Sequence, residues 1–269
     1  MKLTHYFIVG RNINLLRGCL RNIKTYAGFD ELSCSKEILV LIYTNPKIPK
    51  ETTQELKDYC DTQEHVRWVA HEETGKDFIH NLYDFWHYGY VHARGELIFR
   101  AGSDQYFNRG AFPALMNAAE KYDVVKNRII LQSQTIENLS KLKELGFQSR
   151  HFCWDLGSAF ETFDHEQFEK NIKEINKNVK EDIVDIDSAL KYWGRPLPLS
   201  TSLGVINRPD GTSWLMSKKD YEMVGPMNIN VIGEHTQDVL IHDRLYLSGF
   251  RSYIVRDCVN LHFVKGESS

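Results

Sequence analysis

Polar residues able to hold a ligand follow each predicted strand in the first half of the sequence. Four such segments are Gly10–Asn12, Tyr43–Asn45, His71–Thr74 and Gly102–Gln105, and together they carry carboxylate, amide, imidazole and hydroxyl groups. In a parallel sheet these segments would meet at the carboxyl ends of the strands, where ligands of open α/β sheets bind. The sequence therefore predicts a polar binding site at that edge.

The common phosphate-binding and catalytic motifs are absent from the sequence. It contains no G-x-x-x-x-G-K-[ST] loop, no G-x-G-x-x-G after the first strand, no G-x-S-x-G elbow and no H-E-x-x-H. The cysteines are odd in number and form no C-x-x-C pair: Cys19, Cys34, Cys60, Cys153 and Cys258. We expect reduced, mostly packed thiols rather than a disulfide framework or a four-ligand zinc site.

Strand-like and helix-like patterns alternate over the first 135 residues. Strands are predicted at His5–Val9, Glu37–Tyr43, Val66–Ala70 and Glu96–Ala101, and helices at Leu15–Ile23, Glu51–Cys60 and Phe78–His92. Nearer the end of the chain, strands are predicted at Ser213–Ser217, Arg251–Val255 and Val259–Phe263, and a helix at Asp238–Ser248. This alternation predicts an α/β fold with a mostly parallel central sheet flanked by helices.

The middle of the chain has a different composition. Residues 139–203 contain stretches rich in Lys, Glu and Asn, such as Phe163–Val184, and then the prolines Pro196 and Pro198. We interpret this region as a helical insertion beside the sheet, within a single domain that spans residues 1–269.

Composition and charge limit the possible partners. The 269 residues are 42% apolar and 26% charged, with a formal net charge of −3, as in an ordinary soluble protein. No apolar run approaches the ~20 residues that span a bilayer, and no charged-then-apolar signal segment opens the sequence. We therefore expect a cytoplasmic protein without a global positive field that would attract nucleic acid.

Three stretches of the sequence resemble the family 2 glycosyltransferases with the GT-A fold. Ala93–Gln105 is similar to the family's A-R-G-E-Y-I-x-F-L-D-x-D-D, and Trp214–Gly225 to the stretch before its V-G-G-F turn. Gly233–Phe250 resembles the helix G-E-D-x-D-L-x-x-R-L-x-x-x-G-Y. The matches occur in the family's order and cover residues 4–135 and 204–265. The resemblance implies a GT-A fold and a hexosyl- or pentosyltransferase, which moves a sugar from a nucleotide-diphosphate sugar to an acceptor hydroxyl.

The resemblance also implies a metal site. Asp104 matches the second acid of the family's D-x-D motif, and His262 matches a histidine that many GT-A enzymes bring to the same metal. This mixed oxygen and nitrogen pair suits Mn²⁺ or Mg²⁺, which neutralises the departing diphosphate. Gly102 replaces the first acid, and Gln105 supplies at most a neutral contact. A turn role for Asp104 and a half-buried structural role for His262 are the alternatives.

Asp238 is the expected general base by the same resemblance. It matches the second acid of the family's E-D pair, and Gln237 replaces the first. In an inverting displacement this carboxylate takes the proton of the acceptor hydroxyl. An N-cap role for Asp238 is compatible with this one. A retaining mechanism stays open, because resemblance rather than geometry places Asp238.

The nucleotide-sugar donor is expected at strand-end residues. The family usually carries T-Y-N-R at the first of these segments, often an Asp at the second, and an Asn at the position of His87. The candidate donor-binding residues are Gly10, Arg11, Asn12, Tyr43, Asn45, His87, Ser103, Gln105, Arg256 and Lys265, the last two as diphosphate partners. A UDP-sugar is favoured over a GDP-sugar, although the missing Asp leaves the base undecided.

The insertion is expected to shape the acceptor site. Arg150–Asp155 and Tyr192–Pro196 interleave aromatic residues with arginine, which suits either sugar stacking or a flipped base, and packing onto the sheet is the alternative. We expect a glycan acceptor. A phage-type transferase acting on a hydroxymethylated DNA base is a second hypothesis, and the net charge of −3 argues against it. A third is a non-catalytic nucleotide- or carbohydrate-binding module, which the missing acids at Gly102 and Gln237 support.

Overall fold

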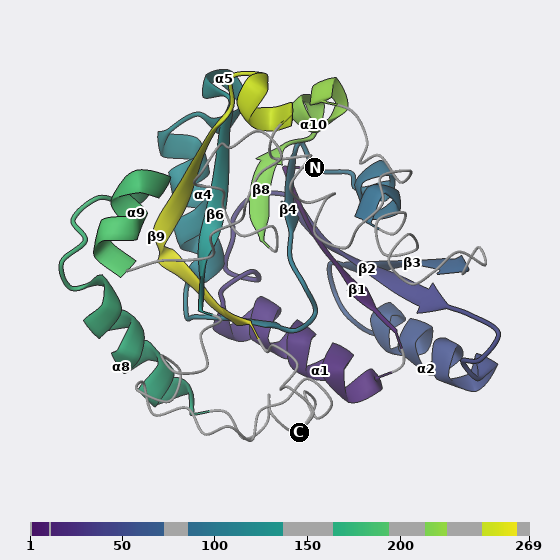
Figure 1. Ribbon diagram of the computed structural model, residues 1–269. Coiled ribbons are helices and arrows are strands. Elements are labelled where there is room, and N and C mark those ends of the chain that lie inside the picture. Colours follow the sequence, from purple (N-terminus) through teal and green to yellow (C-terminus); the bar gives the residue numbers. More distant parts are fainter. Residues whose placement is uncertain are drawn as a thin grey trace, which may run out of the picture.

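A curled mixed sheet forms the centre of the structure, a computed structural model that describes residues 2–10, 12–72, 86–136, 164–193, 213–224 and 244–262 (Figure 1). The strands lie in the order β3-β2-β1-β4-β8-β6-β9-β5, with β7 paired to β9. The strands are β1 (Leu3–Val9), β2 (Lys36–Thr44), β3 (Val66–Glu72), β4 (Leu97–Arg100), β5 (Gln105–Phe107), β6 (Ile129–Ile136), β7 (Ile183–Asp185), β8 (Trp214–Ser217) and β9 (Arg251–His262). The helices are α1 (Ile13–Arg21), the π-helix η1 (Asn22–Tyr26), α2 (Lys50–Asp61), α4 (Ala111–Lys121), α5 (Val124–Asn127), α8 (His165–Asn176), α9 (Ile186–Trp193) and α10 (Lys218–Val224).

The first four strands form the parallel half of the sheet, as the sequence pattern predicts. β1 lies between β2 and β4 and is parallel to both, and β3 is parallel to β2. All four strands therefore end at the same edge, which we call the carboxyl edge. The opposite edge, where these strands begin, is the amino edge.

Two apolar clusters cover the two faces of this half. On one face Ile38, Val40 and Ile42 of β2 pack with residues of α1, α2 and α4. On the other face Leu39 and Leu41 pack with residues of α10 and of the helical segment 86–92. Because β2 is buried on both faces, its sequence is a nearly continuous apolar run rather than an alternating one.

The other half of the sheet is mixed, which the prediction of a mostly parallel sheet did not include. β8 is antiparallel to β4 and β6, β9 is parallel to β6, and β5 is antiparallel to β9. β9 is a single strand where two were predicted. Its pairing with β6 shifts register between Ser133 and Gln134, so that residues 256–258 bulge out of the ladder. The predicted break thus corresponds to a β-bulge within one strand.

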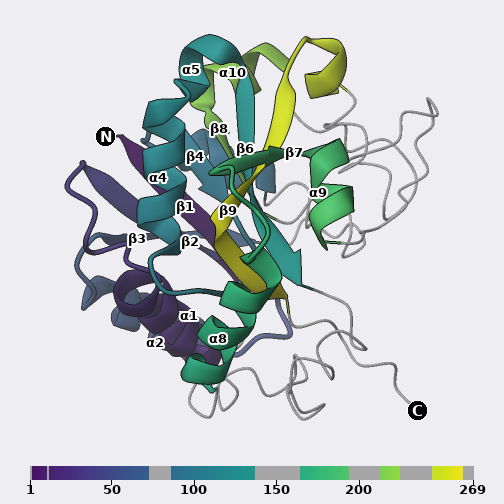
Figure 2. The same ribbon diagram turned by 90° about the vertical axis from the view of Figure 1, so that its left-hand side faces the viewer.

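The insertion contributes a strand as well as helices. α8 begins after Asp164, whose carboxylate accepts a hydrogen bond of 2.9 Å from Gln167 N, and it ends at Asn176. The β-branched residues that follow form β7, which is antiparallel to β9, so the insertion that was expected to be helical also contains a strand. Figures 1 and 2 show α8 and α9 on the β9 side of the sheet. Residues 139–163 and 194–203 lie outside the described ranges.

Two further predictions fall partly outside those ranges. Residues 86–92 and 244–247 are helical, whereas 78–85 and 238–243 are not described. Cys19, Cys34, Cys60 and Cys258 are free thiols, and burial raises the pKa of Cys60 to about 12. In the ranges that the structure describes, every helix is too short or too polar to cross a lipid bilayer.

Candidate functional site

The turn that follows β4 brings Asp104 against the end of β9. His262 Nε2 lies 3.2 Å from Asp104 Oδ2, although the two residues are 158 positions apart in the sequence. The pairing of β5 with β9 produces this contact, because it sets Gln105 directly opposite His262. The structure therefore brings together the two residues that the sequence assigns to a metal.

The environment of this pair keeps the carboxylate ionised. The side chains of Asp104 and His262 are 36% and 19% exposed. Burial acts to raise the pKa of Asp104, but the charge of His262 and the hydrogen bonds to the carboxylate hold that pKa below its usual value. Asp104 can therefore offer a negatively charged oxygen at neutral pH.

The two residues form a small ligand set. Within the described ranges, no three His, Cys, Asp or Glu side chains lie close enough together to hold a metal ion. A carboxylate oxygen and an imidazole nitrogen nevertheless fit the ligand preference of Mn²⁺, which accepts both atom types. The protein would supply these two ligands, and the role of the pair in metal binding stays a prediction.

Gly102 has a structural reason to replace the first acid of the motif. A Cβ atom at this position would lie 2.3 Å from Asp104 Oδ1, much closer than real contacts allow. The backbone N–H of Gly102 donates a hydrogen bond of 3.0 Å to Gln105 Oε1, which closes the turn. The half-buried Ser103 lies within this turn. The carboxylate of Asp104 thus occupies the space that a side chain at position 102 would need.

The expected nucleotide-binding residues lie together at the ends of β1 and β2. Asn12 Oδ1 accepts a hydrogen bond of 3.0 Å from Leu15 N and caps α1. Asn45 Oδ1 accepts one of 2.8 Å from Lys47 N and closes the turn after β2. A Cβ at Gly10 would meet no atom within 4 Å, so the space beside Gly10 is open. Both amide oxygens therefore serve the local backbone, and a nucleotide role stays a prediction.

A row of aromatic rings lies beside this edge, and of its members only Tyr43 and His71 fall in the predicted strand-end segments. Tyr43 pairs with His71 at the end of β3, and the ring centroid of His71 is 4.5 Å from that of Tyr88. Tyr88 is in turn 4.2 Å from His92, one helical turn further along. The spacing of four residues between Tyr88 and His92 could have indicated this contact, because residues i and i+4 share one face of a helix. His87 stacks on Tyr90, with 6.1 Å between ring centroids.

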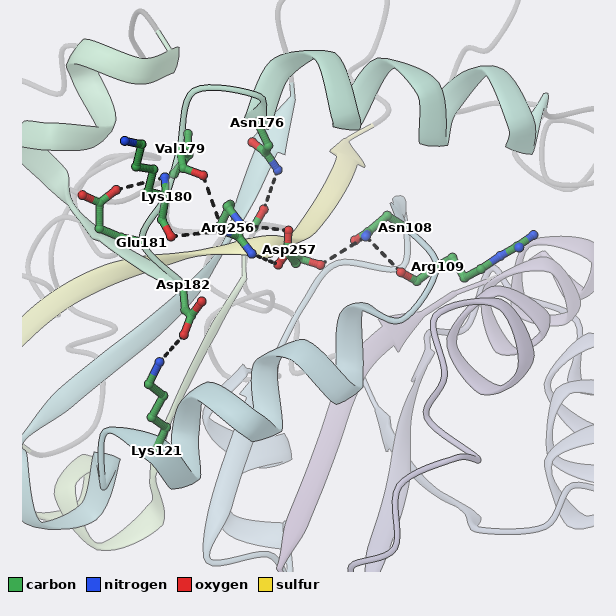
Figure 3. Close-up of polar contacts among 10 residues, drawn as sticks. All are labelled: Asn108, Arg109, Lys121, Asn176, Val179, Lys180, Glu181, Asp182, Arg256 and Asp257. Atoms are coloured by element: carbon green, nitrogen blue, oxygen red, sulfur yellow. Dashed lines mark hydrogen bonds and ion pairs between the residues drawn. The ribbon is translucent and has the colours of Figure 1, made fainter.

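Arg256 makes several contacts within the protein at the bulge of β9 (Figure 3). Its guanidinium donates two hydrogen bonds to the Asp257 carboxylate, at 3.0 and 2.6 Å, and reaches the carbonyl oxygens of Val179 and Lys180. The carbonyl of Arg256 accepts a bond of 2.7 Å from Asn176 Nδ2. Arg256 thus joins the bulge of β9 to the segment between α8 and β7, and its role as a diphosphate partner stays a prediction.

The remaining candidates divide between the insertion and the part that is not described. Arg11, Asp238, Lys265 and the segment Arg150–Asp155 lie outside the described ranges. In the insertion, Trp193 Nε1 donates a hydrogen bond of 3.0 Å to Asn176 Oδ1, so this indole helps to hold α9 beside α8. Tyr192 is 39% exposed.

Comparison with known proteins identifies the fold. The sequence matches no protein-family model and no curated protein. The structure, however, matches GalNAc-T7 with UDP, GalNAc and Mn²⁺ over 100% of this chain, at 12% identity and a TM-score of 0.59. It also matches the mannosyltransferase PcManGT from Pyrobaculum calidifontis in complex with GDP-Man and Mn²⁺ over 99%, at 12% identity and 0.55. A third match is S. aureus TarS, over 98%, at 10% identity and 0.56. The chain has a GT-A-like glycosyltransferase fold.

The GT-A-like fold agrees with the resemblance found in the sequence. The chain spans 46%, 58% and 37%, respectively, of the three solved chains, so those proteins are considerably longer. Identities this low establish the fold alone. The chemistry of this GT-A-like protein must therefore be argued from its own residues.

Proposed function

We propose that the protein transfers a hexosyl or pentosyl group from a nucleotide-diphosphate sugar to an acceptor hydroxyl. The observation that carries this proposal is the contact between Asp104 and His262 at the carboxyl edge of a GT-A-like fold. Two structures with this fold contain a nucleotide or nucleotide sugar together with Mn²⁺, which supports a donor of this class.

Asp104 and His262 would hold the divalent cation, Mn²⁺ or Mg²⁺. When bound, such a cation neutralises the negative charge that develops on the departing diphosphate. The chain contributes the ionised carboxylate of Asp104, and His262 keeps it ionised and oriented. Gln105 holds the turn in place through the backbone of Gly102.

The ends of the first strands would bind the nucleotide. Gly10, Asn12, Tyr43 and Asn45 lie at neighbouring strand ends, with Arg11 between the first two in sequence. The rings of Tyr43, His71 and Tyr88 offer flat apolar surfaces, and a nucleobase stacks on such surfaces. We propose UDP as the first nucleotide to test and GDP as the second.

Asp238 is the proposed base of an inverting transfer, and Lys265 a proposed diphosphate partner. Both assignments rest on the family resemblance. A carboxylate that takes the hydroxyl proton is needed for the reaction but not for donor binding. We therefore expect Asp238→Asn to lose transfer and to retain donor binding. A glycan is the proposed acceptor.

A non-catalytic nucleotide-binding module is the second candidate function. The observation that favours it is the single carboxylate in the turn after β4, where Gly102 stands in place of the first acid of the family motif. A module with this fold would still bind the nucleotide through the strand ends, but it would lack turnover.

One set of measurements separates the candidates. Binding of UDP, GDP, UDP-glucose and GDP-mannose is measured calorimetrically in Mn²⁺ and again in EDTA, and release of the free sugar is then followed over time. We expect binding of one nucleotide series that weakens at least tenfold in EDTA, together with slow donor hydrolysis. Binding without hydrolysis or transfer to any glycan would favour the module. No binding of either series would overturn both functions.

A further inference from the structure

Four neutral polar side chains gather beside the turn Gly102–Gln105, and we name them the hydroxyl cluster: Ser133, Thr135, Ser213 and Asn260. Asn260 Nδ2 lies 3.1 Å from both Thr135 Oγ1 and Ser213 Oγ. It also contacts Ser133 Oγ, which in turn contacts Ser213 Oγ. Thr135 is half-buried and the other three are buried, so Thr135 is the most accessible member.

Strand pairing places the hydroxyl cluster next to the turn that carries Asp104. Arg100 of β4 pairs with Trp214 of β8. Ser213 directly precedes Trp214, and Ala101 directly follows Arg100 and leads into that turn. The cluster therefore lies one strand away from the turn, at the carboxyl edge of the sheet.

The cluster also shares a strand face with His262. Asn260 precedes His262 by two residues in β9, and side chains two apart on a strand point to the same face. At ~3.3 Å per residue, their Cα atoms are about 6.6 Å apart. One small ligand beside Asp104 and His262 would therefore reach Asn260.

Hydrogen-bonding capacity beside the pair is left unused. Asn260 Oδ1 and Gln105 Nε2 are both buried, and neither has a hydrogen-bond partner among the described residues. Gln105 lies opposite His262 in the ladder, so these two amides belong to the same face. Buried polar atoms in native proteins normally have partners. An acceptor and a donor that both lack partners are together the complement of a hydroxyl group, which both donates and accepts.

We infer that the hydroxyl cluster and Gln105 bind a hydroxyl group of the transferred sugar, and that this sugar is uncharged, such as a hexose or an N-acetylhexosamine. The inference rests on the proposed function, because a sugar lies here only if Asp104 and His262 hold the donor diphosphate. The members of the cluster are all neutral, and Asp104 in the neighbouring turn is an anion. None of the four carries a positive charge that would pair with the carboxylate of a uronic acid.

The test compares three folded variants of the full chain with the wild type. Asn260→Ala removes the free acceptor. Thr135→Val removes one hydroxyl of the cluster at nearly constant volume, and it decides the question if Asn260→Ala fails to fold. Asn171→Ala, in α8, is the matched control, since Asn171 is also a buried asparagine. The probes are UDP, UDP-glucose and UDP-glucuronic acid, or GDP and GDP-mannose if the wild type selects guanine, titrated calorimetrically in Mn²⁺.

We expect the wild type to bind the neutral nucleotide sugar about tenfold more tightly than the bare nucleotide, because a sugar hydroxyl adds hydrogen bonds of this net strength. Asn260→Ala and Thr135→Val should reduce that preference severalfold while they bind the bare nucleotide within twofold. Asn171→Ala should keep the preference. An unchanged preference in the folded cluster variants overturns this inference alone, as does tighter binding of UDP-glucuronic acid. A wild type that binds no nucleotide overturns the proposed function and this inference with it.

Discussion

The two edges of the parallel half of the sheet differ in how far the hydrogen-bonding capacity of their polar groups is used within the protein. At the amino edge, a buried network holds the starts of β1, β2 and β3 together, and its hydrogen bonds run between protein groups. At the carboxyl edge, Asp104 and His262 form a half-buried pair, and next to them Gln105 and Asn260 each keep one buried atom without a partner among the described residues. A satisfied network stabilises the fold, whereas unused capacity is available to a ligand.

Glu37 is the centre of the amino-edge network. Its Oε1 accepts hydrogen bonds from Thr4 Oγ1 at 2.8 Å and from Arg94 N at 2.9 Å. Arg67 Nε donates to Oε2 at 3.0 Å. Burial acts to raise the pKa of Glu37, but these partners hold it below its usual value. The carboxylate is therefore ionised and fully used by the fold.

The largest effect should come from Asp104→Asn at the carboxyl edge. Loss of the negative ligand should reduce Mn²⁺-dependent transfer about a thousandfold, or roughly 4 kcal/mol in transition-state stabilisation. The free energy of unfolding should change by less than ~1 kcal/mol, since no described strand depends on this carboxylate. Steady-state transfer assays and urea denaturation measure the two quantities. Transfer close to the wild-type rate would remove the metal site from the mechanism.

Glu37→Gln should show the reverse behaviour at the amino edge. Removal of the charge leaves Arg67 partly unpaired inside the structure, and breaking such a pair costs about 3 kcal/mol of unfolding free energy. Affinity for the nucleotide, measured on folded protein, should stay within twofold. Glu55→Gln is the control, because its contact with Arg17 is exposed and should contribute little. Weakened nucleotide binding without loss of stability would contradict the division between the edges.

His5, between the two edges in β1, should make the fold sensitive to acid. Burial among phenylalanine rings lowers the pKa of His5 from 6.5 to about 3, so the unfolded chain binds one more proton between these values. Stability should therefore fall as the pH drops below 6.5, by about 2 kcal/mol at pH 5, and this contribution levels off near pH 3. The free energy of unfolding, measured by urea denaturation at several pH values across this range, should depend less on pH for His5→Leu than for the wild type. An equal slope of unfolding free energy against pH in both proteins would exclude His5 as the source of the acid sensitivity.

The smallest effect should come from Gly102→Ala. The added Cβ would have to displace the Asp104 carboxylate, and we expect Mn²⁺ affinity to fall about tenfold, or ~1.4 kcal/mol. Gly102→Asp sharpens the test, since it restores the acid of the family motif. If the space at position 102 determines Mn²⁺ affinity, Gly102→Asp should weaken Mn²⁺ binding at least as much as Gly102→Ala. Tighter binding by Gly102→Asp would show instead that the number of carboxylate ligands determines the affinity.

Short-range patterns in the sequence determined much of the parallel half. The continuous apolar run of β2 predicts a strand buried on both faces, and the structure confirms it. The turn after β4 also follows from local sequence, because Gly102 and Ser103 end the apolar run directly before Asp104. Such features are predictable because burial and turn conformation depend on residues close together in the chain.

Only the tertiary structure decided which side chains meet. The sequence did not reveal that the bulge of β9 directs Arg256 to Asp257 and to the segment beside β7. Family resemblance suggested that Asp104 and His262 meet, but only the pairing of β5 with β9 brings the two within hydrogen-bonding distance. The place of Asn260 could not be predicted from the sequence, because its neighbours come from β6 and from Ser213, directly before β8. Contacts between distant segments depend on strand order and register, and neither can be predicted from a local sequence pattern.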